Sequence, residues 1–149
     1  MAEIGFYHLT RTPLEQALPK LLGRVLAGGG RALVQVVSAE RLAALDAALW
    51  VCQDPDWLPH GTPATGHAEL QPIWLTPEDA SAPNAARFLF LVDGAESARL
   101  GDYDRVLDLF DGGDDAALAA ARARWKAAKA AGHELAYWQQ GARGWEKKA

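Results

Sequence analysis

Two alternating patterns of apolar residues run along the first third of the chain. Short, nearly continuous apolar runs cover residues 4–9 and 32–37, as is typical of strands buried on both faces. After each run, leucines recur at helical spacing, over residues 14–26 and then 42–49. This strand–helix–strand–helix order predicts a parallel sheet with helices on its faces.

Capping residues set the expected ends of the helices. Thr12, Pro13 and Glu15 supply a capping hydroxyl, a proline at the first helical position and a reciprocal carboxylate. Ser38 is expected to cap the second helix. A third, Ala-rich helix is predicted over residues 114–131, ended by Gly132.

The rest of the chain adds strands without adding a second domain. Apolar runs at residues 71–75, 87–92 and 105–110 predict three more strands. Residues from about 133 onward are interpreted as a polar-aromatic tail. We therefore expect a single α/β domain over residues 1–149, with about five mostly parallel strands and helices on both faces of the sheet.

Motifs for catalysis, cofactors and metals are missing from this sequence. The three glycines at 28–30 precede a strand instead of following one, so they cannot hold a phosphate at a helix N-terminus. The single Cys52 and four scattered histidines do not form a metal motif. We expect no catalytic activity, cofactor or metal. The N-terminus lacks signal-peptide features and no apolar run could span a membrane, which predicts a cytoplasmic protein.

The net charge of −4 is unevenly distributed. Residues 122–149 contain 7 Lys/Arg and 2 Asp/Glu, against 8 and 17 in residues 1–121. The basic segment either meets an anionic partner or balances acidic neighbours within the fold. Aromatics at Trp125, Tyr137, Trp138 and Trp145 also allow direct binding of single-stranded nucleic acid as an alternative function, although the acidic remainder of the chain opposes it.

A row of cations on the third helix is the first candidate site. Helical spacing places Arg122, Lys126 and Lys129 on one stripe, bordered by Trp125. Such a surface suits an acidic peptide with an apolar anchor and a terminal carboxylate. The alternative is an ordinary amphipathic helix with Trp125 in the core and a solvated basic face.

A second candidate site lies around Trp50 and Trp57. Trp57 stands in a polar, Pro-rich loop, where so large an apolar side chain is unusual. If exposed, it would mark a site for a protein partner. Alternatively, it folds back onto Trp50 and closes the edge of the sheet.

Several phrases of the sequence occur together in one known family. FYHL (6–9), LDAALW (45–50), WLPHG (57–61) and QPIWLT (71–76) follow in order, and RxRWKxxKxxG (122–132) precedes YWQQ. The chain resembles the chi subunit of bacterial DNA polymerase III along essentially its whole length. This resemblance implies a Rossmann-like α/β fold without a nucleotide site, and a non-catalytic accessory subunit of the polymerase holoenzyme.

The resemblance also implies two partners and their sites. Family members bind the acidic, Pro-Phe-ending tail of single-stranded DNA-binding protein, which by motif would contact Arg122, Trp125, Lys126 and Lys129. They also bind the psi subunit, which links chi to the clamp loader. The matching motifs would put that interface at Trp50, Trp57, Pro59 and His60.

Overall fold

Strands and helices alternate along the chain in the computed structural model, which describes residues 2–52 and 58–149. The strands are β1 (Glu3–Leu9), β2 (Ala32–Gln35), β3 (His60–Gly61), β4 (Ile73–Thr76), β5 (Phe88–Val92), β6 (Arg105–Asp111), β7 (Glu134–Gly141) and β8 (Gly144–Lys147). The helices are α1 (Leu14–Ala27), α2 (Ala39–Trp50) and α3 (Asp115–Ala130), with short 3-10 turns at Ala68–Leu70 and Leu100–Asp102.

One sheet joins all of these strands in the order β3-β4-β2-β5-β6-β1-β7-β8. Every neighbouring pair is parallel except the hairpin of β7 and β8. The predicted single, mostly parallel α/β domain is therefore confirmed. The count of about five strands is wrong, because the part of the chain that the structure describes contains eight.

The additional strands lie at the two edges of the sheet. β3 has only two residues, too few to produce a periodic pattern. The predicted tail from about residue 133 instead forms β7, which pairs in parallel with β1, and β8, which returns beside it. Polar residues such as Gln139 and Gln140 hid β7 from the sequence pattern, because most residues of this strand are only partly buried.

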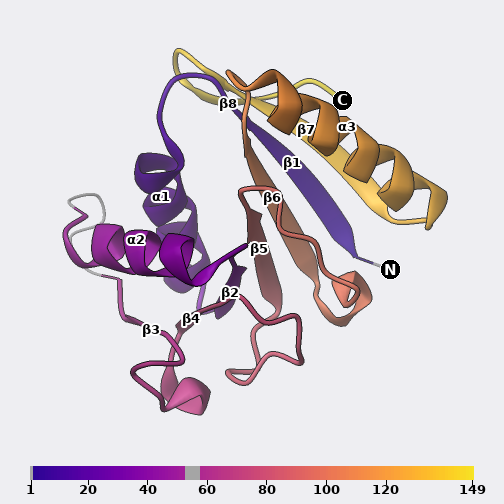
Figure 1. Cartoon of the computed structure of the whole chain (residues 1–149). Helices are drawn as coiled ribbons and strands as arrows, with labels where there is room; N and C mark the ends of the chain where they lie inside the picture. Colours follow the sequence, from indigo (N-terminus) through magenta and orange to yellow (C-terminus); the bar gives the residue numbers. More distant parts are fainter. Residues whose placement is uncertain (1, 53–57) are drawn as a thin grey trace.

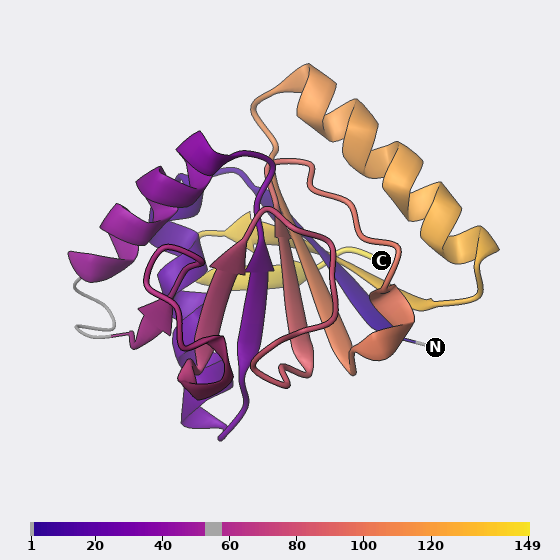
Figure 2. The ribbon, with the colours of Figure 1, turned by 60° about the horizontal axis from the view of Figure 1, so that its bottom comes forward.

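The helices divide between the two faces of the sheet (Figures 1 and 2). On one side, here called the α1 face, Leu18 and Leu22 of α1 and Leu45 of α2 join a cluster with side chains from the central strands. On the other side, the α3 face, Ala121 and Ala128 of α3 pack in a second cluster. The core is thus two apolar layers separated by the sheet.

The start of α1 differs from its predicted form. Pro13 occupies the N-cap position, and no side chain caps the helix. The Thr12 hydroxyl instead accepts a hydrogen bond from Nε2 of Gln140 at 2.6 Å, while Glu15 pairs with Arg41 at 2.9 Å. Tertiary contacts have therefore displaced the local capping box. The predicted cap at Ser38 is confirmed, since its Oγ accepts from the Arg41 amide.

Within residues 2–52 and 58–149, no helix is both long and apolar enough to cross a membrane. The same residues contain no group of three or more His, Cys, Asp or Glu side chains placed to hold a metal ion.

Candidate protein-binding surfaces

Helix α3 begins at a well-formed cap. One carboxylate oxygen of Asp114 accepts hydrogen bonds from the amides of Ala116 and Ala117, at 2.9 and 3.3 Å. These amides are among the four that every helix leaves without an internal partner. Small buried residues, Ala121 and Ala128, then let the helix lie close to the sheet.

A buried ion pair fixes the rotation of α3 on the sheet. Arg124 donates through Nε and one terminal nitrogen to the two carboxylate oxygens of Asp108 in β6, at 2.7 and 2.9 Å. The two side chains are only 11% and 2% exposed. Burial raises the pKa of Asp108, and the hydrogen bonds and charge of Arg124 act in the opposite direction. Sequence reasoning missed this pair, although an acid inside the apolar run of β6 needs a partner.

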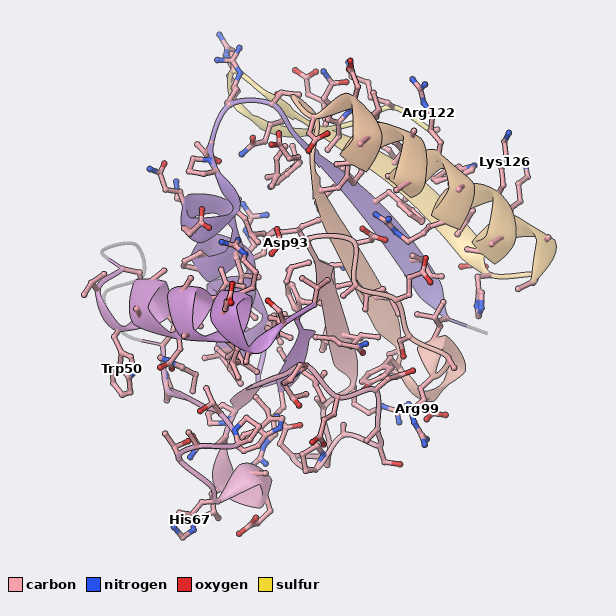
Figure 3. All side chains as sticks on the ribbon, viewed as in Figure 1. Trp50, His67, Asp93, Arg99, Arg122 and Lys126 are labelled. Carbon is pink, nitrogen blue, oxygen red and sulfur yellow. The ribbon has the colours of Figure 1, made fainter. Side chains whose placement is uncertain are left out.

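With Arg124 turned inward, the remaining cations face solvent. We call Arg122, Lys126 and Lys129 the basic row; all three are exposed. Figure 3 shows Arg122 and Lys126 extending outward from α3. Among residues 2–52 and 58–149, none of the three has an ion-pair or side-chain hydrogen-bond partner. The basic row is therefore available to an anionic group.

Trp125 lies between the core and the surface. Its ring meets Phe6 edge-on, with centroids 5.4 Å apart, and Tyr137 of β7 at 6.0 Å. The side chain is half-buried. Trp125 thus packs against the α3-face cluster without being fully buried, and it lies beside the exposed basic row.

Further aromatic side chains pack around Trp125 and support it. The hydroxyl of Tyr137 lies 2.7 Å from Nδ1 of His8, whose ring stacks on Phe110 at 5.2 Å. Burial raises the pKa of Tyr137, while the charge of Arg122 lowers it. The sequence patterns assign Tyr137 to the C-terminal segment from about residue 133 and do not include it in the candidate peptide site. Its place in the partly polar strand β7 gives no separate sign of its contact with Trp125.

The second surface contains exposed apolar side chains at the end of α2. Trp50 is 59% exposed and the following Val51 is 75% exposed. Trp50 also contacts the ring of His60 at 4.7 Å. Figure 3 shows Trp50 far from Arg122, on the opposite side of the sheet. The two candidate surfaces therefore leave room for two partners at once.

His60 supports Trp50 from below and is not itself exposed. Its side chain is buried, with Nε2 at 2.9 Å from an Asp46 oxygen and Nδ1 at 2.7 Å from the Leu58 carbonyl. Pro59 is half-buried beside it. Trp57, the fourth residue predicted for this surface, lies outside the described residues.

The α3 face also contains a cavity of about 320 Å³ between α3 and the sheet. Most of its lining is apolar, including Phe6, Leu91 and Leu100. Its polar lining comprises Asp108 and Arg124, which are bonded to each other, together with Glu96, Ser97 and His133.

These features define a class of α/β protein with exposed aromatic and cationic surfaces suited to binding other proteins. A family model for the DNA polymerase III chi subunit, HolC, matches residues 1–136. The chain belongs to the DNA polymerase III chi subunit family, so its role is that of an accessory subunit in DNA replication. A comparison with curated proteins gives no match.

Proposed function

We propose that this chain is a non-catalytic adaptor that binds the C-terminal tail of single-stranded DNA-binding protein through α3 and the psi subunit through α2. The observation that carries the proposal is the basic row of Arg122, Lys126 and Lys129, exposed beside the accessible edge of Trp125. In the family, this adaptor links the clamp loader to protein-coated single strands.

The chemistry of the basic row suits an acidic peptide that ends in an aromatic residue. Three cations without internal partners attract the acidic groups of the peptide and orient its approach. The planar guanidinium of Arg122 can form two parallel hydrogen bonds with a terminal carboxylate. Trp125 offers an apolar edge to the terminal ring of the peptide, since edge-to-face contacts between aromatic rings are favourable.

The α2 surface suits an apolar partner. Large exposed apolar side chains that lie together often mark protein interfaces, and Trp contributes strongly when it becomes buried in one. Asp46 binds His60, and the His60 ring contacts Trp50. This contact restricts the Trp50 side chain and so limits the side-chain entropy lost on binding. Psi is the partner that the family assigns to this surface.

Calorimetric titration with an acidic peptide ending in Pro-Phe tests the α3 site. We expect Arg122→Ala and Lys126→Ala each to weaken binding about tenfold, or ~1.4 kcal/mol. Arg143→Ala is the matched control, because it removes the same charge from the exposed turn between β7 and β8. Amidation of the peptide C-terminus should also weaken binding. If both α3 variants bind as tightly as wild type, the proposed site is wrong.

Co-purification with the psi subunit of the same organism tests the α2 surface. Trp50→Ala should abolish or strongly reduce the complex, whereas Val37→Ala should leave it intact. Val37 is a suitable control because it is another large apolar residue with 51% of its surface exposed. Retention of the psi complex by Trp50→Ala would contradict the assignment without affecting the α3 proposal.

A further inference from the structure

A cavity of about 480 Å³ lies on the α1 face, between the end of α1 and the β7–β8 hairpin. It is distinct from both surfaces above and opens near the amino ends of β5 and β6, which begin at Phe88 and Arg105. Its volume is within the usual range of small-ligand sites. Neither the basic row nor Trp50 contributes to it.

Glycines account for the open space. Gly28 ends α1, so the helix does not extend over this part of the sheet. Gly5 of β1 lacks a side chain, and the ring of Tyr7 leans into the vacant position; a Cβ at Gly5 would come within 2.7 Å of that ring. The ring of Tyr7 is therefore part of the cavity lining, together with the aliphatic side chains of Leu21, Val25 and Leu107.

Aromatic rings line several sides of this cavity. Tyr7 and Phe88 come from the central strands, and Trp138 and Trp145 come from the hairpin. Trp145 meets Tyr7 edge-on at 5.0 Å and is itself half-buried. Aromatic faces of this kind stack on nucleobases with little dependence on the base, because every base has a π-face.

Two arginines supply the charge. Arg24 is exposed, and its side chain has no ion-pair or hydrogen-bond partner within residues 2–52 and 58–149. Arg105 is 40% exposed; it lies 3.9 Å from Glu3 and reaches the Tyr7 hydroxyl only at 3.5 Å. Lys147 pairs with Trp138 across the hairpin, so it emerges on the same face. The cavity entrance is therefore locally positive in an acidic protein.

We propose that this cavity binds one nucleotide unit, with its base against the aromatic rings and its phosphate at Arg105 and Arg24. The unit is either a free nucleotide or part of a single strand. The C-terminus of α1 is the negative end of its helix dipole, so the phosphate is expected between the Arg24 and Arg105 side chains, and the base is expected over the glycines that follow the helix. Guanidinium groups match the geometry of phosphate oxygens. An acidic peptide fits less well, because it has few planar groups to cover so many rings.

Titration of a labelled 15-nucleotide oligo(dT) with the full chain, followed by fluorescence anisotropy at about 50 mM salt, tests this proposal. The double variant Arg24→Ala with Arg105→Ala should weaken binding at least tenfold. It should also reduce the slope of log K against log salt concentration by about 0.7 for each phosphate that it no longer neutralises. Trp145→Ala should weaken binding about 5- to 150-fold, because it removes a stacking surface for the base. Competition with dTMP distinguishes a free nucleotide, which displaces the oligonucleotide, from a strand-only site.

The matched control combines Arg11→Ala with Arg143→Ala. It removes the same charge from the opposite end of the sheet, where β1 and β7 end, and should bind within twofold of wild type. Arg122→Ala with Lys126→Ala should also keep oligonucleotide binding, which separates this proposal from the peptide site on α3. No binding by wild type, or equal losses in the control and the Arg24/Arg105 variant, would overturn the proposal. A selective loss of acidic-peptide binding in the Arg24/Arg105 variant would also overturn it, and would identify a peptide site instead.

Discussion

Replacement of Arg124 by Met tests the idea that one ion pair orients the basic row. Both members of the Arg124–Asp108 pair are nearly fully buried and share two short hydrogen bonds, so solvent screening does not weaken the interaction. Met keeps the apolar length of Arg124 but leaves the Asp108 carboxylate without a partner. Breaking a buried pair in this way costs about 3–5 kcal/mol. That loss is a large part of the roughly 5–15 kcal/mol typical of a folded domain.

The loss in free energy of unfolding caused by Arg124→Met should depend on pH in a defined direction. Burial already raises the pKa of Asp108 above its ordinary value of 3.8, and removal of Arg124 eliminates the interactions that oppose this rise. An acid with a raised folded-state pKa binds its proton more tightly when folded. Its contribution to stability is therefore fully present below pH 3.8 and is lost as pH rises through the folded-state pKa. The deficit of Arg124→Met should be smallest in acid and largest at neutral pH.

Urea denaturation followed by circular dichroism at about pH 5 and pH 7 measures both effects. Arg122→Met is the matched control, because it removes an exposed arginine two residues away on the same helix and should change stability by no more than about 0.5 kcal/mol. Asp108→Leu combined with Arg124→Met should recover much of the lost stability, since an apolar pair can replace a buried ion pair. If Arg124→Met were no more destabilising than Arg122→Met, the anchoring role would be refuted.

Three further predictions concern the β7–β8 hairpin and the core beside it. Gln140→Ala should lower the free energy of unfolding by about 1–3 kcal/mol in urea denaturation, because Oε1 of Gln140 accepts hydrogen bonds from the three consecutive amides of residues 10–12. Gln139→Ala is the control and should be nearly neutral. Trp138→Phe should change the free energy of unfolding by less than about 1 kcal/mol, since Nε1 is buried without an acceptor among the described residues; a loss above about 2 kcal/mol would contradict this account. Gly5→Ala should lower the thermal midpoint, because the new methyl group collides with Tyr7, and combination with Tyr7→Leu should relieve the loss.

Local patterns predicted the centre of the sheet well and its edges poorly. Central strands are covered on both faces, so their apolar runs are continuous, as in the run that contains Phe90. Strand β7, next to the edge strand β8, is only partly buried and carries Gln140, which binds the loop before α1. That contact joins residues 128 positions apart, and no local rule relates them. The same contact explains why the Thr12 capping box does not form.

The candidate sites show a similar division. Helical spacing placed Arg122 and Lys126 on one stripe, and both are exposed on α3. It could not show that Arg124 turns inward, because that depends on Asp108 in a different element. The positions of Trp50 and His60 were recognised by motif, but only the fold shows that His60 is buried beneath Trp50.

The three proposed surfaces differ in their relation to the family. The basic row and Trp50 lie within residues 1–136, the span that the family model matches, whereas Trp138 and Trp145 lie beyond it. The family match ends within β7, so most of the hairpin that completes the aromatic cavity lies outside the matched residues. The edge strand β8 carries Glu146 and Lys147, charges that discourage pairing with a further strand. Trp138 and Trp145 pack on the α1 face, whereas the basic row lies on α3 at the other face, so the two sites share no residue. A nucleotide unit and an acidic tail can therefore occupy the molecule together.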